Sequence, residues 1–343
     1  MVGEKRGLNL PNTLKQTVTE FGHSPDGARV DRVSISNGGV TARIITWGAS
    51  LQDFRHDAVP HPLVLGSPSL APYLTRMLYF GAIAGRVANR IAGGSAMLEG
   101  RRLTLERNDK GRSTLHGGSR GSTSVNWTLE DIAPTSCQMS VVLPDGQGGF
   151  PGAVTITVVY ALNDQGALSV DLTARTDAPT FCNLAHHSYW NLDGSADISR
   201  HKLWVNADRY LPLDGDQIPL DAPLAVAGTP FDFRQPRTPD TRLDHNFCLN
   251  DALGLRPACT FEGGGLRLTV ETTEPGLQVY DGFGIDTQGD LGLQGAPYGS
   301  RAGLALEPQR WPDAPNHPDF PSILLRPDQT YRQTSVFRVE NCG

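Results

Sequence analysis

The chain has 343 residues, of which 38% are hydrophobic and 19% are charged, and its formal net charge is −6. These values fit a globular protein with a large core and exclude an intrinsically disordered chain. Lys and Arg are scattered along the chain and are outnumbered by Asp and Glu, so no nucleic-acid partner is expected. A small neutral or polar ligand fits this charge balance better than a polyanion does.

The sequence also gives no sign of a membrane segment or an export signal. Lys5 and Arg6 are not followed by an apolar stretch, and no apolar run approaches the length of a membrane span. The five cysteines include no CxxC pair, and we interpret them as reduced, buried thiols and not as disulfides or metal ligands. We therefore expect a cytoplasmic protein that has no membrane partner.

Alternation of apolar and polar residues with period 2 dominates the chain and predicts strands. The clearest example is Val154 to Tyr160, where every second residue is apolar and would share one face. In chain order, the predicted strands are residues 40–47, 154–160, 168–174, 202–207, 266–271 and 335–339. Asn37-Gly38-Gly39 predicts a tight turn before the first of them. Residues 71–79 are the best helical candidate.

These elements predict an all-β fold, a large antiparallel β-sandwich, because sandwiches bury many short strands economically. Proline and glycine are spread through the chain, and no stretch resembles an interdomain linker. We therefore expect a single domain over residues 1–343, with an N-terminal extension of about residues 1–25.

Two glycine-flanked segments carry polar residues that a plain sandwich does not need. Residues 85–94 contain Arg86, Asn89 and Arg90, and spacing alone favours a surface loop with solvated arginines. A second segment, Leu115-His116-Gly117-Gly118, would present the His116 ring from a tight turn, although a lone histidine is more often structural.

A third segment, residues 183–192, contains His186 and His187 followed by Tyr189 and Trp190. Adjacent residues of a strand point to opposite faces, so at most one of the two histidines can face a given site. A metal site built from both is therefore not expected. The aromatic pair could form core or a stacking platform for a sugar ring, and core is the better interpretation for at least one of them.

Carboxylates mark two further places. Glu307 follows the apolar run 302–306, and a buried carboxylate is costly unless it is paired or functional. Asp244-His245-Asn246 forms another polar group just before Phe247. Together these residues predict an enzyme site built from His, Asp and Glu, and they leave the reaction open.

The same segments, in this order, resemble the aldose 1-epimerase (galactose mutarotase) family. The matching stretches run from about residue 40 to residue 339 and are residues 85–94, 115–118, 145–152, 183–192, 228–233, 244–247, 272–276 and 306–321. The resemblance implies the antiparallel supersandwich of that family and interconversion of the α and β anomers of a free aldohexose.

The resemblance also implies the roles of individual residues. Glu307 matches the general base and His187 the general acid, while Asn89, Arg90, His116, Asp244 and Gln278 match residues that contact the sugar. It implies no cofactor and no metal, and galactose or glucose as the sugar. With ordinary pKa values, activity would fall at low pH as Glu307 is protonated and at high pH as His187 loses its proton.

The sequence departs from the family pattern at Asp281-Gly282-Phe283, close to the expected pocket, which bears on sugar preference. Three other functions stay open at this point: a non-catalytic carbohydrate-binding sandwich, a glycosidase using Asp244 and Glu307, and a sugar-phosphate epimerase. A matched acid and base argues against a pure binding protein. Either a monomer or a homodimer is compatible with the sequence.

Overall fold

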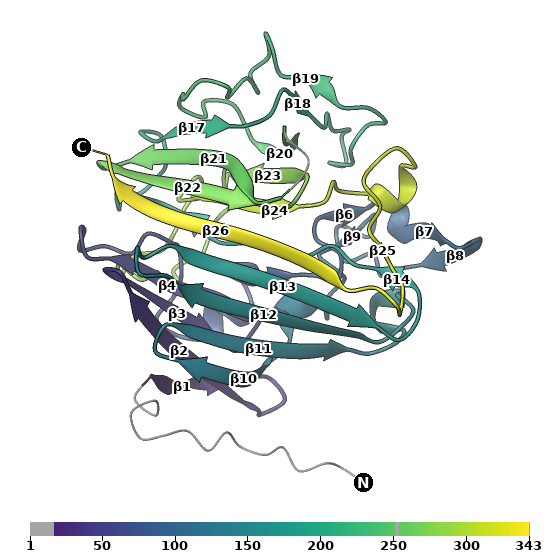
Figure 1. The fold of residues 1–343 in the computed structure, drawn as a ribbon, viewed down its shortest axis with the longest axis horizontal. Coiled ribbons are helices and arrows are strands. Elements are labelled where there is room, and N and C mark those ends of the chain that lie inside the picture. Colours follow the sequence, from purple (N-terminus) through teal and green to yellow (C-terminus); the bar gives the residue numbers. More distant parts are fainter. Residues whose placement is uncertain (1–16, 251–253, 343) are drawn as a thin grey trace.

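The structure is a computed structural model that describes residues 17–250 and 254–342. In this part of the chain the secondary structure is strands and short 3-10 helices (Figure 1). The 3-10 helices are η1 (Ala71–Leu74), η2 (Ala92–Gly94), η3 (Ser122–Ser124), η4 (Gln147–Gly149) and η5 (Ala314–Asn316). The predicted all-β fold is confirmed. None of the helices in residues 17–250 and 254–342 is long and apolar enough to cross a membrane.

The largest layer is an antiparallel sheet of eight strands, which faces the viewer in Figure 1. In spatial order it consists of β10 (Thr128–Ala133), β11 (Ser136–Leu143), β12 (Val154–Leu162), β13 (Leu168–Thr176), β26 (Tyr331–Asn341), β22 (Leu266–Thr272), β21 (Arg256–Gly263) and β17 (Lys202–Val205). Five of the predicted strands lie here, with ends that differ by a few residues.

Two further antiparallel sheets complete the main fold. One consists of β1 (Val18–His23), β2 (Arg29–Asn37), β3 (Val40–Ile45) and β4 (Ser50–His56). The other runs in the order β16 (Tyr189–Trp190), β24 (Leu304–Gln309), β23 (Gly276–Tyr280), β20 (Asp244–Cys248), β18 (Arg209–Tyr210) and β19 (Leu224–Ala225).

Short two-stranded ladders tie the connecting segments to these sheets. They pair β5 (Ile83–Ala84) with β15 (Ala185–His186), β6 (Arg90–Ile91) with β9 (Thr114–Leu115), β7 (Ser95–Leu98) with β8 (Arg101–Thr104), and β14 (Thr180–Phe181) with β25 (Leu324–Leu325). Of the predicted N-terminal extension, residues 1–16 lie outside the described residues, and β1 pairs with β2.

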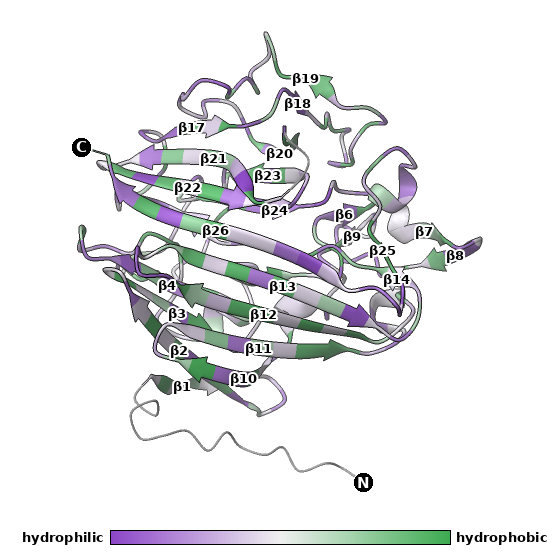
Figure 2. Ribbon diagram, in the orientation of Figure 1, coloured by the Kyte–Doolittle hydropathy of each residue, from purple (hydrophilic) through white to green (hydrophobic). Residues whose placement is uncertain are grey.

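Alternating hydropathy explains why these segments form strands. In β12, Val154, Ile156, Val158 and Tyr160 are buried, and the residues between them are at least partly exposed; Figure 2 shows the same alternation along neighbouring strands. Each fully buried aliphatic side chain contributes roughly 1.5–3 kcal/mol. The predicted turn at Asn37-Gly38-Gly39 also forms. Both glycines have positive φ, as a two-residue hairpin loop between β2 and β3 requires.

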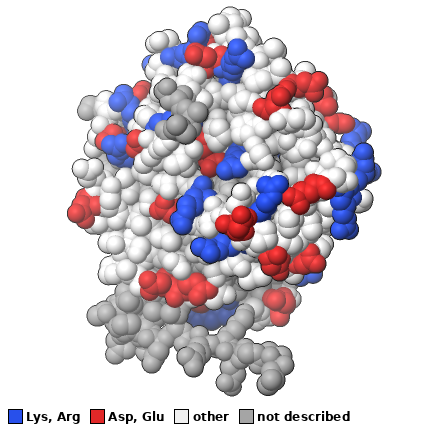
Figure 3. Space-filling model, turned by 45° about the vertical axis from the view of Figure 1, so that its right-hand side comes forward, with Lys and Arg blue, Asp and Glu red and all other residues white. Residues whose placement is uncertain are grey.

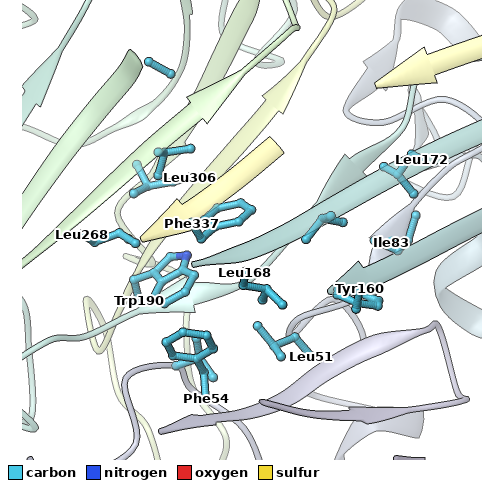
Figure 4. Close-up of a cluster of buried hydrophobic side chains, with 14 of the residues drawn as sticks. Leu51, Phe54, Ile83, Tyr160, Leu168, Leu172, Trp190, Leu268, Leu306 and Phe337 are labelled. Carbon is cyan, nitrogen blue, oxygen red and sulfur yellow. The ribbon is translucent and has the colours of Figure 1, made fainter. Parts of the chain in front are cut away.

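The main core lies between the sheets. Apolar residues of β2, β3 and β4 pack in one buried cluster with those of β12, β13, β23 and β24. Trp190 lies at its centre (Figure 4), stacked on Phe337 at 5.5 Å and with its edge against Phe54 at 5.4 Å. Acidic and basic side chains are interspersed on the face seen in Figure 3, without a large patch of one sign.

Two local expectations are wrong. Of residues 71–79, only Ala71–Leu74 is helical, as a 3-10 turn, because the stretch is too short to bury an apolar helix face. Four of the cysteines are buried free thiols, but Cys342 is exposed, since it follows the end of the last strand, β26.

One buried carboxylate outside the pocket predicts a pH-dependent stability. Burial raises the pKa of Glu274 to about 7, against the opposing charges of Arg310 and Arg256. Because this carboxyl group binds its proton more tightly in the folded protein, protonation stabilises the fold. The stabilisation is fully present below the pKa that Glu274 has in the unfolded chain, and it is lost as the pH rises through about 7. Ionising this carboxyl group costs about 3 kcal/mol more in the folded protein than in the unfolded chain.

The side chain of Glu274→Gln cannot ionise. The melting temperature of the variant minus that of wild type should therefore be a few degrees higher at pH 8 than at pH 5. Thermal unfolding at the two pH values measures this. The exposed Glu130→Gln serves as the control and should shift the melting temperature equally at both. A Glu274→Gln difference that is constant with pH would contradict the prediction.

Candidate active site

A pocket of about 460 Å³ opens beside the six-stranded sheet, within the size range of small-molecule sites. Six of the seven residues predicted for the site line it: Asn89, Arg90, His116, His187, Asp244 and Glu307. The seventh, Gln278, is buried directly behind Asp244 and donates a hydrogen bond to its Oδ1 at 2.7 Å. The structure therefore brings together residues from six separate stretches of the chain.

Strand alternation places the carboxylates on the pocket side. Leu277 and Val279 of β23 and Leu304 and Leu306 of β24 belong to the main core. The residues between them point the other way, so Gln278 lies opposite Glu307 in the ladder. On the next strand, β20, Asp244 pairs with Tyr280 and is within hydrogen-bond reach of Gln278.

His187 and Glu307 face each other at the buried end of the pocket. His187 Nε2 lies 3.5 Å from Glu307 Oε1, and both side chains are almost fully buried. The backbone of His187 is fixed, because its N–H donates to the carbonyl of Ala82 and its carbonyl accepts from the N–H of Gly81. An imidazole and a carboxylate at this separation can exchange or share a proton.

Burial shifts both members of this pair towards their neutral forms. It raises the pKa of Glu307 well above its ordinary value, with a further rise from the negative charge of Asp244 and a smaller opposing effect of Arg90. Burial also lowers the pKa of His187 to about 4. Both shifts favour the form of the pair in which Glu307 carries the proton and His187 is neutral.

Asn89 and His116 lock each other at the end of the β6–β9 ladder. The backbone N–H of His116 donates to the backbone carbonyl of Asn89 at 3.0 Å, and the backbone N–H of Asn89 donates to the ring nitrogen Nδ1 of His116 at 3.2 Å. This leaves Nε2 as the protonated nitrogen of the neutral ring. Burial, with the nearby His187 and Arg90, lowers the pKa of His116 well below its ordinary value. His116 is therefore a neutral hydrogen-bond donor at the pocket wall.

Arg90 and Asp244 are held by a polar network. Arg90 Nε donates to Asp109 Oδ2 at 2.8 Å, and its Nη2 donates to Gln217 Oε1 at 2.9 Å. Asp244 Oδ2 accepts from Gln217 Nε2 at 2.7 Å and lies 3.9 Å from Arg90 Nη1. The network presents a guanidinium and a carboxylate side by side, a combination that suits sugar hydroxyl groups.

Aromatic rings form another part of the wall. Tyr79 stacks on His187 with ring centroids 5.9 Å apart, and Tyr189 lies 5.0 Å from the same imidazole. Trp190 points into the main core, which confirms that at least one of the two aromatic residues is core. Tyr79, Asp109 and Gln217 could not be predicted from the sequence, because they lie in turns and loops without a repeating pattern.

His186 points away from the pocket, as strand alternation predicted. Its ring packs edge-on against Phe337 at 5.1 Å and Tyr160 at 6.0 Å in the core, and its Nε2 is 3.0 Å from Ser188 Oγ. The two adjacent histidines therefore cannot bind one ion. In residues 17–250 and 254–342 no three His, Cys, Asp or Glu side chains come together as a metal site.

The expectation that Arg86 is solvated is wrong. Its side chain is fully buried, and its guanidinium donates to the carbonyls of Leu143, Pro144, Pro151 and Gly152 and to Thr180 Oγ1. A buried arginine needs acceptors for its donors, and these carbonyls replace water. Arg86 thus ties the segment before the pocket to neighbouring loops, and Arg90 alone of the two reaches the pocket.

A buried carboxylate–imidazole pair and a polar network in a sugar-sized pocket define a carbohydrate-active β-sandwich protein. The sequence matches the aldose 1-epimerase family over residues 31–338. It is 39% identical to the galactose mutarotase of Rattus norvegicus over 339 residues, covering 94% of this chain and 98% of that protein. It is 34% identical to the aldose 1-epimerase of Escherichia coli (strain K12), covering 92% and 96%.

Solved structures agree. An aldose epimerase homologue from C. elegans superposes with a TM-score of 0.86 at 29% identity, covering 91% of this chain and 99% of that one. A galactose 1-epimerase from Lactobacillus acidophilus gives 0.82 at 25% identity, covering 95% and 98%. The chain belongs to the aldose 1-epimerase family. It is an isomerase acting on carbohydrates that interconverts the anomers of aldoses.

Proposed function

We propose that this protein interconverts the α and β anomers of a free aldohexose, galactose or glucose, with Glu307 and His187 as its acid/base pair. The observation that carries the proposal is the contact between His187 Nε2 and Glu307 Oε1, 3.5 Å apart and buried in a pocket with room for a sugar. The anomeric carbon of such a sugar, C1, belongs to a cyclic hemiacetal, and opening the ring needs one proton removed and one proton added.

Ring opening begins with Glu307 as a carboxylate and His187 as an imidazolium. Glu307 removes the proton of the C1 hydroxyl, the C1 oxygen becomes the aldehyde oxygen, and the bond between C1 and the ring oxygen breaks. His187 donates its proton to the departing ring oxygen, which becomes the C5 hydroxyl. Charge is balanced throughout, because the pair gives one proton and receives one.

Ring closure reverses these steps after rotation about the C1–C2 bond. The C5 hydroxyl attacks the opposite face of the aldehyde and returns its proton to His187, while protonated Glu307 gives its proton to the aldehyde oxygen. The pair thus needs the same single proton in both directions. Closure thus returns Glu307 to the carboxylate and His187 to the imidazolium, the form in which opening began. Where the free protein carries the proton on Glu307, its transfer to His187 across 3.5 Å produces this form before opening.

The remaining pocket residues bind the sugar in this proposal. Arg90 and Asp244 hold ring hydroxyls as donor and acceptor, and the positive charge of Arg90 stabilises charge that develops on an oxygen in the transition state. Asn89 and His116, which also line the pocket, contribute further polar contacts. Gln278 acts indirectly here, because it contacts Asp244 and lies behind the pocket surface.

Polarimetry of freshly dissolved α-galactose and α-glucose tests the proposal. We expect the purified protein to accelerate the change in rotation, and to do so in buffer containing EDTA, because the acid/base pair needs no metal. A protein that binds these sugars without accelerating mutarotation would instead be a carbohydrate-binding sandwich. Release of reducing ends from an oligosaccharide would indicate a glycosidase, and activity limited to phosphorylated sugars a sugar-phosphate epimerase.

The cytoplasm is the compartment we propose, since Cys137, Cys182, Cys248 and Cys259 are buried free thiols that suit a reducing environment. We also propose that the protein is a single domain, acts without a cofactor, and is either a monomer or a homodimer. Size-exclusion chromatography with light scattering distinguishes the two assembly states.

A further inference from the structure

Gln217 reaches the pocket from a turn far from the other site residues in sequence. It lies between β18 and β19, in a turn built on Asp214, whose carboxylate accepts the N–H groups of Asp216 at 2.8 Å and Ile218 at 2.9 Å. The N–H of Gln217 donates to the Asp214 carbonyl at 3.1 Å. Gln217 itself has a φ of +62°, a left-handed conformation that costs energy for a residue with a side chain.

The Gln217 amide bridges the two charged groups of the pocket wall. Its oxygen accepts from Arg90 Nη2 at 2.9 Å, and its nitrogen donates to Asp244 Oδ2 at 2.7 Å. Only this orientation of the amide makes both contacts favourable, since an arginine offers only donors and a carboxylate only acceptors. Both hydrogen-bond partners of the Gln217 side chain are therefore residues of the proposed sugar site.

Without Gln217, Arg90 and Asp244 would be linked only loosely. Arg90 Nη1 and Asp244 Oδ2 are 3.9 Å apart, which is beyond hydrogen-bond distance. Gln278 holds the other carboxylate oxygen, Oδ1, from behind. Gln217 and Gln278 together thus fix both oxygens of Asp244, and Gln217 sets the spacing of the carboxylate from the guanidinium.

We propose that Gln217 is a positioning and specificity residue, which aligns Arg90 and Asp244 as a matched donor and acceptor for two hydroxyl groups of the sugar. The inference rests on the proposed function. A side chain that served only to hold the turn would have no need to span two charged groups of the pocket, because the turn already has its own hydrogen bonds through Asp214. Since Gln217 is half-buried at the pocket edge, its replacement should leave the core unchanged.

Gln217→Met keeps the length of the side chain and removes both hydrogen bonds. Because hydrogen bonds to charged groups are among the stronger ones, we expect kcat/KM for galactose or glucose to fall about 10-fold or more, chiefly through a higher KM. The kcat should change much less, since Glu307 and His187 are untouched. The melting temperature should stay close to that of wild type.

Gln217→Glu separates positioning from a structural role. When protonated, a glutamic acid can donate to Asp244 and accept from Arg90, as the amide does. When ionised, it repels Asp244. The activity of this variant relative to wild type at the same pH should therefore rise as the pH falls from 8 to 5.5, whereas the ratio for Gln217→Met should be nearly constant.

Leu220→Ala is the matched control, because Leu220 lies in the same loop and is exposed. It should retain wild-type KM and kcat. The inference is overturned if Gln217→Met keeps the wild-type KM, if Leu220→Ala raises KM equally, or if the ratio for Gln217→Glu does not depend on pH. If wild type itself does not accelerate mutarotation, the proposed function has failed, and that result is distinct from any of these.

Discussion

Glu307→Gln should lose nearly all mutarotase activity. The substitution keeps the shape of the side chain and removes the carboxylate that, in the proposed mechanism, takes the proton from the C1 hydroxyl. Loss of a positioned general base costs about 10²- to 10⁴-fold in rate, and we expect the loss in kcat, not in KM. Polarimetric progress curves over a range of sugar concentrations separate the two parameters.

The same substitution should not destabilise the protein. Since burial raises the pKa of Glu307, its ionisation opposes folding at neutral pH, and a neutral amide avoids that cost. An unchanged or higher melting temperature together with lost activity would mark Glu307 as a residue kept for chemistry. The exposed Glu130→Gln is the control and should leave the activity unchanged. Near-wild-type kcat in Glu307→Gln would contradict the proposed base.

The fold could be predicted from the sequence because its signal is local. Period-2 alternation in residues 154–160 gives the inward face of β12, and the same pattern marks β13, β22 and β26. The order of strands in the sheets could not be obtained this way. β26 lies between β13 and β22, and that pairing depends on contacts between segments far apart in the chain.

The candidate site could be predicted only in part. Strand alternation alone placed His186 and His187 on opposite faces, and the position of Glu307 after an apolar run indicated a buried carboxylate. The assignment of Asn89, Asp244 and Gln278 depended on the family resemblance, because no spacing rule predicts which distant segments of the chain meet at one pocket. Gln217 could not be found, since nothing near it in sequence indicates that its turn reaches Arg90.

The structure also changes how the pH dependence is explained. With ordinary pKa values Glu307 would set the acidic limb of activity and His187 the alkaline limb. Burial lowers the pKa of His187 to about 4 and raises that of Glu307, so the roles of the two groups are exchanged. Between the pKa of His187 and that of Glu307, the pair carries one proton. It gains a second proton as the pH falls through about 4, and it loses the remaining proton as the pH rises above the pKa of Glu307. We therefore expect kcat/KM to fall only near pH 4 on the acidic side.

His187→Asn should reduce kcat by about 10²-fold or more, because the substitution removes the group that we propose protonates the ring oxygen. In the structure the imidazole is 3.5 Å from Glu307 Oε1, and its other neighbours, Tyr79, Tyr189 and His116, are poor substitutes as acids. Burial raises the pKa of both tyrosines and lowers that of His116. His187 differs from these neighbours in facing the Glu307 carboxylate at 3.5 Å, where it can exchange a proton with Glu307 directly.

His186→Asn is the matched control, since it makes the same chemical change one residue away on the opposite face of the strand. His186 packs against Phe337 and Tyr160, so the variant should melt at a lower temperature and still retain most of its kcat. The two variants should thus show opposite patterns when kcat is measured by polarimetry and stability by thermal unfolding. If His186→Asn abolished turnover and His187→Asn preserved it, His187 could not be the acid that protonates the ring oxygen.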